Sequence, residues 1–171
     1  MVFDRRALMG GMAAAAVIGN PAARAASCLV TPDGPEGPFY PPSFAEADLD
    51  MTRIAGSERR ADGTVIEVIG RVIDDRCQPI ANAEVDVWQA NAVGRYSHPR
   101  DSSNPRPLDA GFQGQARLRT DADGAYRYLT IVPGAYPVSS SWWRPPHIHY
   151  RVSQGGQIAL TTQLYFAGED L

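Results

Sequence analysis

Six short segments with the composition of β-strands limit what this chain can fold into. They are rich in β-branched and aromatic residues, and turn residues such as Asp123-Gly124 and Gly155-Gly156 separate two of the pairs. The segments cover residues 64–74, 83–90, 115–121, 125–132, 148–154 and 157–166. Beyond the N-terminal leader, no window shows a helical period over about twelve positions. The sequence therefore predicts one all-β domain, a sandwich or a barrel, over residues 27–171.

Two regions lie outside this strand pattern. Residues 28–57 are rich in proline and glycine without a sustained period, which predicts an irregular arm lying over the rest of the domain. Residues 91–115 form a long connection, and such connections in compact domains are usually functional or disordered. Asp121-x-Asp123-Gly124 resembles the start of a calcium loop. The later acidic ligands and flanking helices of such a loop are missing from the pattern, so a hairpin turn is the better interpretation.

The first 26 residues have the layout of an export signal and are kept apart from the fold. Arg5-Arg6 stands before an apolar run from Ala7 to Gly19, and residues 23–26 end the leader with small side chains. The run is shorter than the roughly 20 residues that span a bilayer. The leader therefore predicts twin-arginine export to the periplasm or the exterior, without a membrane span. The alternative is a frayed N-terminal helix.

Cys28 and Cys77 are the two cysteines of the chain. In an oxidising compartment they favour one disulfide, which would tie the arm to the first hairpin. It would close a loop of about 50 residues, for which chain entropy predicts roughly 4 kcal/mol of stabilisation. A lipid-modified Cys28 is the alternative, but Ala25 stands three residues before it, where such signals usually have leucine.

The charge balance argues against some classes of partner. The formal net charge is −3, the pI is about 5.6, and all 16 lysine-or-arginine cations are arginine. Nucleic acids and acidic membrane surfaces attract proteins with the opposite balance. We therefore expect a small-molecule ligand rather than a nucleic acid, while a homo-oligomer stays possible.

His147 and His149 lie in the stretch SWWRPPHIHY, residues 141–150. In a strand, side chains at i and i+2 share a face, so both imidazoles could bind one metal ion. The spacing alone does not distinguish a metal site from a strand with two half-buried imidazoles. Zinc enzymes need a third His, Cys or carboxylate ligand, and a cupin-like site needs a glutamate that residues 150–156 do not supply. A copper site that adds His98 stays open.

Two tyrosines offer a different set of ligands. Tyr96 follows a glycine turn after the 83–90 segment, and Tyr136 sits in a proline-bracketed loop eleven residues before His147. The ordinary alternative for each is a packed tyrosine with a satisfied hydroxyl. A phenol has a pKa near 10, so it binds only strongly acidic cations, and ferric iron accepts phenolate oxygen together with imidazole nitrogen. A mixed Fe(III) site is therefore a hypothesis.

Five stretches in one order resemble the intradiol ring-cleavage dioxygenases, above all the protocatechuate 3,4-dioxygenase β-subunit type. They are EGPFYPP, GRVIDDRCQPIANAEVDVWQANAVGRYSH, GAYRYLTIVPGAYPV, WWRPPHIHYRVS and TTQLYFAGED. The resemblance runs from about Cys28 to the last residue. It implies a transthyretin-like β-sandwich with an irregular N-terminal arm. It also implies a non-haem Fe(III) enzyme that uses O₂ to cleave a catechol-type diol to a cis,cis-muconate-type diacid.

Carried over by position, the resemblance implies a role for each site residue. The protein ligands of the ferric ion would be Tyr96, Tyr136, His147 and His149. Tyr136 matches the axial tyrosinate that the substrate displaces, and Arg144 matches an arginine that stabilises the anionic substrate. Gln163 matches a glutamine near the substrate and oxygen pocket. The implied catalytic residues are therefore Arg144, Gln163 and Tyr136.

The sequence departs from this family at one pocket position and leaves two other functions open. Val138 stands where the protocatechuate enzymes tend to carry tryptophan, so we expect a different pocket wall. The first alternative is a non-catalytic, transthyretin-like binding module, which the loss of any of the four ligands would favour. The second is a histidine-based copper or zinc enzyme, which would be favoured if Tyr96 and Tyr136 lay far from the histidines.

Overall fold

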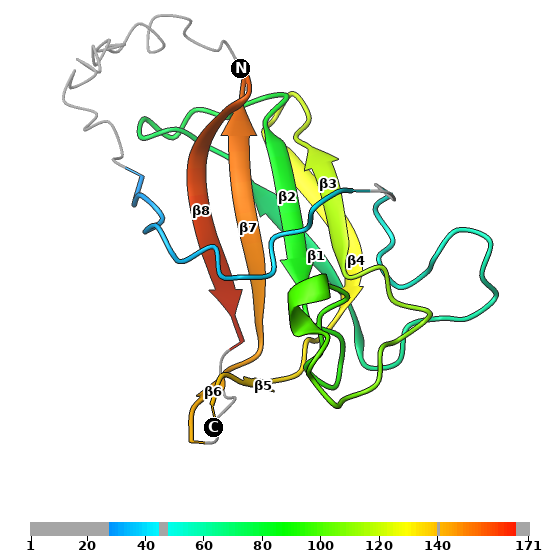
Figure 1. The fold of residues 1–171 in the computed structure, drawn as a ribbon. Coiled ribbons are helices and arrows are strands. Elements are labelled where there is room, and N and C mark those ends of the chain that lie inside the picture. The colour runs from blue at the N-terminus through cyan, green and yellow to red at the C-terminus, as the bar shows by residue number, and fades with distance from the viewer. Residues whose placement is uncertain (1–27, 45–47, 140, 167–171) are drawn as a thin grey trace, which may run out of the picture.

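The computed structural model describes residues 28–44, 48–139 and 141–166 (Figure 1). The predicted export signal lies outside these residues. The strands are β1 (Val65–Arg71), β2 (Glu84–Gln89), β3 (Gln115–Arg119), β4 (Ala125–Ile131), β5 (Tyr136–Pro137), β6 (Trp143–Arg144), β7 (His147–Gln154) and β8 (Gln157–Tyr165). The helical content of the described chain is one 3₁₀ turn, η1 (Pro99–Asp101), and no described helix is long and apolar enough to cross a membrane. The all-β prediction is confirmed.

Two sheets face each other across the core (Figure 1). The larger sheet has the strand order β3-β2-β7-β8, and the smaller one pairs β1 with β4; every pair of strands is antiparallel. A short ribbon of β5 and β6 lies at the end of the larger sheet where β7 begins and β8 ends (Figure 1). The sheets have open edges, so the fold is the predicted sandwich rather than a barrel.

The two-residue repeat of the strands separates core from polar residues. Val85 and Val87 of β2 are fully buried and pair with Val152 and Tyr150 of β7. These side chains pack against Tyr128 and other residues of the opposite sheet. Burying such a side chain contributes about 1.5–3 kcal/mol, so this face holds the two sheets together. The alternate residues Asp86, His149 and Arg151 must therefore point to the outer face of the larger sheet.

The N-terminal arm covers that outer face (Figure 1). The backbone N–H of Gly34 donates to the carbonyl of Thr161 in β8 at 2.8 Å. The Thr162 hydroxyl donates to the carbonyl of Pro32 at 3.0 Å. The predicted arm is therefore present, and it runs across β8 with its own backbone hydrogen bonds.

A buried carboxylate anchors the arm further along. Asp86 of β2 is 2% exposed and accepts from the Tyr40 hydroxyl at 2.6 Å. Arg117 of β3 donates to the same carboxylate from Nε at 2.6 Å and from Nη2 at 2.9 Å. A buried charge is tolerated when it is paired and hydrogen-bonded in this way. The arm is thus fixed to the sheet at a second point.

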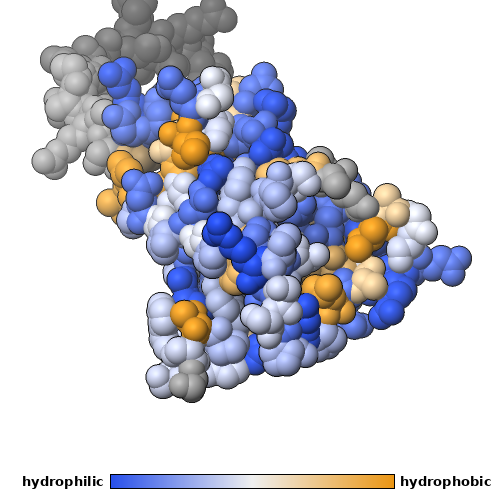
Figure 2. Space-filling model, in the orientation of Figure 1, coloured by the Kyte–Doolittle hydropathy of each residue, from blue (hydrophilic) through white to orange (hydrophobic). Residues whose placement is uncertain are grey.

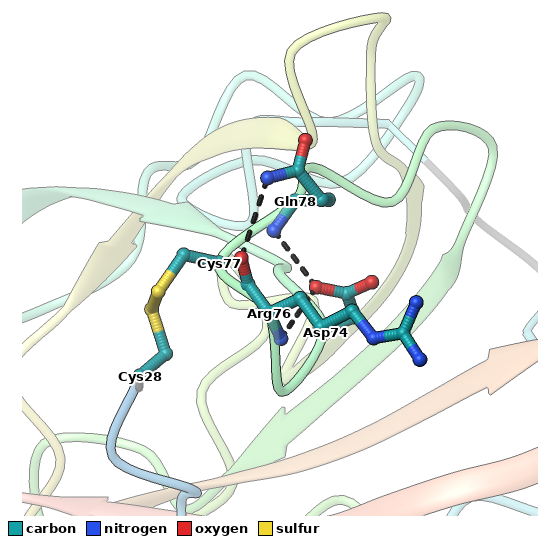
Figure 3. Close-up of a disulfide and its surroundings, with 5 residues drawn as sticks. All are labelled: Cys28, Asp74, Arg76, Cys77 and Gln78. Carbon is teal, nitrogen blue, oxygen red and sulfur yellow. Dashed lines mark hydrogen bonds between the residues drawn. A yellow bond between two sulfur atoms is a disulfide. The ribbon is translucent and has the colours of Figure 1, made fainter. Parts of the chain in front are cut away.

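The beginning of the arm is tied down covalently. Cys28 and Cys77 form a disulfide across 49 residues of sequence (Figure 3). The Asp74 carboxylate accepts from the backbone N–H of Arg76 at 2.9 Å and of Gln78 at 2.8 Å, which fixes the turn that carries Cys77. This turn also explains why β1 ends at Arg71 although the strand pattern continues to residue 74.

The sequence predicted the turn at Asp121 but not the β5–β6 ribbon. The Asp121 carboxylate accepts from the backbone N–H of Asp123 at 2.9 Å and of Ala125 at 2.8 Å, so the stretch is a hairpin turn as expected. The β5–β6 ribbon was not predicted. Its two-residue strands are too short to show a period, and Pro137 is a residue that strand patterns exclude.

Candidate metal centre

His147 and His149 lie side by side on the outer face of β7. Each is 2% exposed, and their Nε2 atoms are 3.1 Å apart. Nδ1 of His147 lies 2.6 Å from the Pro145 carbonyl. Because a carbonyl oxygen only accepts, Nδ1 carries the proton and the Nε2 lone pair points toward His149. A backbone carbonyl that orients one ring nitrogen while the other faces a common point is typical of metal-binding histidines.

Tyr96 and Tyr136 join the two histidines. Tyr96 follows β2 and Tyr136 begins β5, and their ring centroids are 5.4 Å apart. The Tyr136 ring lies 5.6 Å from His147, and the Tyr96 ring lies 6.2 Å from His149. The tyrosines are buried as well, at 3% and 8% exposure. The structure therefore gathers two phenols and two imidazoles in one buried cluster, while their role as iron ligands stays a prediction.

Burial sets the protonation of this cluster. It lowers the pKa of His147 to about 4 and, with the neighbouring His147, lowers the pKa of His149 to about 3. Both imidazoles are then neutral at physiological pH, with a lone pair each for a metal ion. Burial raises the pKa of Tyr96 and of Tyr136, while the nearby Arg144 guanidinium acts in the opposite direction. The phenols therefore stay protonated unless a strong cation binds them.

Two buried polar atoms of the cluster have no well-formed hydrogen bond in the described part of the chain. They are the Tyr96 hydroxyl and Nδ1 of His149. Leaving such a group unpaired costs about 1–3 kcal/mol, so most buried polar atoms find a partner. A cation held between the four side chains would give the Tyr96 oxygen a partner and would bind both Nε2 atoms, while Nδ1 of His149 points elsewhere and would gain nothing from it. Two phenolates and two imidazoles are a set that fits Fe(III).

Among the residues that the structure describes, a histidine-based copper or zinc site finds no third ligand. Within the described ranges, no group of three or more His, Cys, Asp or Glu side chains is placed to bind one ion. His98 instead begins η1, where its Nδ1 accepts from the backbone N–H of Arg100 at 3.1 Å. Since Tyr96 and Tyr136 adjoin the histidines, the condition that would have favoured a copper or zinc enzyme is not met.

Three further residues hold the cluster in place, and sequence reasoning assigned them no role. Trp88 of β2 stacks on His149 with centroids 4.8 Å apart and an angle of 8°. Phe39 of the arm stacks on Tyr96 at 4.4 Å. Gly37 has a φ of +73°, and a Cβ there would lie 3.3 Å from Cε1 of His149. Phe39 also meets Tyr136 edge-on at 6.0 Å between centroids, so the arm packs on three of the four candidate ligands. The family resemblance included the arm stretch EGPFYPP, which contains Gly37 and Phe39, but the sequence did not show that these residues contact the candidate ligands.

Arg144 and Gln163 meet beside the cluster. Arg144 donates from Nη2 to Oε1 of Gln163 and, at 2.7 Å, to the hydroxyl of Tyr165. Tyr165 donates in turn to Oε1 of Gln163 at 2.5 Å, and its ring lies 5.6 Å from that of His147. The Gln163 amide also donates to the Pro35 carbonyl of the arm at 2.5 Å. The structure thus brings both predicted residues to the site and adds Tyr165, which sequence reasoning missed.

Known proteins resemble this chain along most of its length. The family model Dioxygenase_C, described as "Dioxygenase", matches residues 35–171. The protocatechuate 3,4-dioxygenase beta chain of Burkholderia cepacia is 44% identical over 141 residues, which are 77% of this chain and 59% of the relative. Catechol 1,2-dioxygenase 2 of Acinetobacter lwoffii is 35% identical over 156 residues, which are 81% of this chain and 52% of the relative.

A solved structure supports the same relationship. The intradiol ring-cleavage dioxygenase from Tetranychus urticae superimposes with a TM-score of 0.65 at 27% identity, over 82% of this chain and 66% of that one. The chain spans between half and three fifths of the length of the two curated relatives. The family match covers the whole sandwich, the arm from residue 35 and all four residues of the cluster. The chain therefore belongs to the intradiol ring-cleavage dioxygenase family.

Proposed function

We propose that this protein is a non-haem Fe(III) dioxygenase that cleaves a catechol-type diol between its two hydroxyl-bearing carbons. The main support for this proposal is the buried cluster of Tyr96, Tyr136, His147 and His149 on the outer face of the larger sheet. In the proposed reaction the carbon–carbon bond breaks and both atoms of O₂ enter the product. The product is a cis,cis-muconate-type diacid, and no external reductant is needed.

A ferric ion in the cluster would supply a strong Lewis acid that takes up both deprotonated catechol oxygens and makes the ring reactive toward O₂. Two phenolates and two neutral imidazoles would leave a bound trivalent ion with a net charge of +1. A catecholate dianion in place of one phenolate would bring that net charge to zero. The charge count therefore favours release of one tyrosine when the substrate binds.

Tyr136 is suited to be the tyrosine that is released. It is the most exposed of the four residues and stands on the two-residue strand β5, whereas Tyr96 packs under Phe39. A released phenolate is a base, so its Oη would take one of the two catechol protons, and a solvent-derived base, hydroxide or water, would take the other. His147 and His149 would stay in place, held by the Pro145 carbonyl and by the Trp88 ring.

Arg144 would stabilise negative charge on the bound ring. Its guanidinium is held by Gln163 and Tyr165, so it does not need to reorganise when charge develops. Phe39 and Trp88 keep water away from the other side of the cluster. In such a dry site, a fixed positive charge acts more strongly than it does in water.

We also propose that the protein is exported. The twin-arginine-type leader motivates this, and the Cys28–Cys77 disulfide supports it, because disulfides persist mainly in oxidising compartments. Cell fractionation should find the chain outside the cytoplasm and without its leader. A lysine pair in place of Arg5-Arg6 should keep it inside, and export of that variant would contradict the twin-arginine route.

The activity is tested by iron content, colour and product. The purified protein should hold about one iron per chain and show a visible absorption from tyrosinate bound to Fe(III). With catechol and ¹⁸O₂ it should give a muconate-type acid that carries both labelled atoms. A colourless, iron-free protein after reconstitution would favour the binding-module alternative. Cleavage outside the diol, or no oxygen uptake with several catechols, would contradict the proposed reaction.

A further inference from the structure

The β5–β6 hairpin continues outward from the candidate centre. Tyr136 is the register partner of Arg144, and Pro137 is the partner of Trp143. The pairing extends one step further, because the backbone N–H of Val138 donates to the carbonyl of Trp142 at 2.8 Å. One short hairpin therefore links a candidate ligand and the arginine at its base with two apolar residues nearer its tip.

The alternation of side chains places these residues on two faces. Paired residues share a face and the next pair points the other way, so Val138 and Trp142 lie on the face of Tyr136 and Arg144. Trp143 lies on the opposite face, where the Arg106 guanidinium stacks on it at 4.8 Å. Trp142 has no ring or cation contact with any described residue.

This hairpin carries the most exposed of the four candidate ligands. Tyr136 is 8% exposed and meets the edge of the Phe39 ring, whereas Phe39 stacks on Tyr96 and Gly37 of the arm lies against His149. The hairpin side is therefore the more open side of the centre. A molecule that reaches the cluster past Tyr136 meets the same face of the hairpin. Val138 is 50% exposed there and Trp142 is 56% exposed.

Exposure alone does not make a binding site. Figure 2 shows that apolar side chains on the visible face lie in separate groups among polar ones, which is ordinary for a protein surface. Trp142 differs from such residues by its place in the register next to Arg144. Its backbone is also held, because its N–H donates to the Ser139 hydroxyl at 3.1 Å.

We propose that Val138 and Trp142 form a subsite for an uncharged aromatic or branched apolar substituent on the catechol ring. The inference rests on the proposed function and names the substrate class, namely catechols that carry an aryl or bulky alkyl group. An indole face offers a flat stacking surface, and Val138 adds apolar area. Neither Val138 nor Trp142 carries a charge, so the contact that they offer is apolar, while Arg144, held through Nη2 by Gln163 and Tyr165, stays the cation for the negative charge of the bound ring.

The test is an anaerobic titration of the iron-loaded protein, followed by its visible absorption, with catechol and with 4-phenylcatechol. Without O₂ no turnover occurs, so the titration measures binding alone. The wild type should bind 4-phenylcatechol about tenfold more tightly than catechol, the size expected from one aromatic stacking contact. Trp142→Ala should abolish this ratio and Trp142→Phe should keep most of it. Trp143→Ala, on the opposite face of the same hairpin, is the matched control and should keep the ratio.

Two results would overturn the subsite alone, and a third would overturn the proposed function as well. An unchanged ratio in Trp142→Ala would overturn the subsite while leaving the iron centre intact. Equal losses in Trp142→Ala and Trp143→Ala would also overturn it, because they would indicate damage to the hairpin as a whole. A wild-type protein that shows no iron absorption would overturn the proposed function together with the subsite.

Discussion

Two pairs of buried tyrosines in this protein have opposite surroundings. Tyr128 of β4 and Tyr150 of β7 lie between the sheets, and their hydroxyls share a hydrogen bond of 2.6 Å. Tyr96 and Tyr136 lie on the other side of the larger sheet, beside His147. The Tyr96 hydroxyl there has no well-formed hydrogen bond among the described residues. The Tyr128 and Tyr150 hydroxyls satisfy each other, whereas the Tyr96 and Tyr136 hydroxyls interact without forming such a hydrogen bond.

Burial alone therefore does not distinguish a tyrosine of a functional site from a tyrosine of the core. Burial raises the pKa of all four phenols. The two pairs differ in the hydrogen bonding of their hydroxyls. The inner pair, Tyr128 and Tyr150, is hydrogen-bonded within the core, and the outer pair is Tyr96 and Tyr136. The outer pair keeps donor atoms available at the cost of stability, as functional sites commonly do.

The largest expected effect comes from breaking the outer pair. Tyr136→Phe removes a proposed ligand and proton acceptor, so catechol turnover should fall by about a thousandfold or more, beyond the 10–100-fold typical of residues that only orient ligands. The visible absorption should shift or vanish. Tyr128→Phe is the matched control, since it removes the same hydroxyl from the inner pair, and it should keep colour and turnover. Equal effects in the two variants would remove the distinction between the pairs.

The second expected effect is a loss of stability of the iron-free protein in acid. Because His147 and His149 have lowered pKa values when folded, the unfolded chain binds protons first as the pH falls below about 6.5. The free energy of unfolding should therefore drop from pH 6.5 toward pH 4, by at least about 2 kcal/mol at pH 5. The inner tyrosines, Tyr128 and Tyr150, affect stability at alkaline pH. Their raised pKa values cost stability only above about pH 10.

Urea unfolding from pH 4.5 to 10.5 measures both limits. His149→Gln should flatten the acid side of the curve, and Tyr128→Phe should leave the acid side unchanged. A wild-type curve that stays level between pH 6.5 and 4.5 would contradict the assignment of two neutral, buried imidazoles.

The strands could be predicted because their signal is local. The 83–90 segment forms β2 (Glu84–Gln89) and the 125–132 segment forms β4 (Ala125–Ile131), each within a residue or two at its ends. The pairing could not be predicted in the same way. In the pairing of β1 with β4, Val65 is opposite Ile131, 66 residues further along the chain, and β2 lies between β3 and β7. Such neighbours are chosen by core packing between distant segments.

In the candidate centre, too, the sequence predicted some residues and not others. The spacing of His147 and His149 was enough to place them on one face; Tyr96 and Tyr136 were candidates from their positions, and the resemblance assigned them as ligands. The residues that orient this set come from distant segments, Phe39 from the arm and Tyr165 from β8. Each acts only through contacts made after folding, so neither has a periodic signal that sequence reasoning could find.

The smallest expected effect is the sharpest test of the comparison. In the iron-free protein, Tyr128→Phe leaves the Tyr150 hydroxyl buried without a partner and should cost about 1–3 kcal/mol of unfolding free energy. Tyr96→Phe removes a hydroxyl whose interaction with Tyr136 falls short of a well-formed hydrogen bond, so it should change the free energy of unfolding by less than about 0.5 kcal/mol or even increase it.

Urea midpoints of the two iron-free variants and of the double variant Tyr128→Phe/Tyr150→Phe decide between these outcomes. The double variant should recover part of the loss, because it removes both partners of the inner hydrogen bond. A cost for Tyr96→Phe as large as that for Tyr128→Phe would mean that the outer phenol is held by the protein itself. The cluster would then be a packed core rather than a place arranged for a metal ion. A neutral Tyr96→Phe that nevertheless binds iron at least a hundredfold more weakly would place the value of that hydroxyl in the metal centre alone.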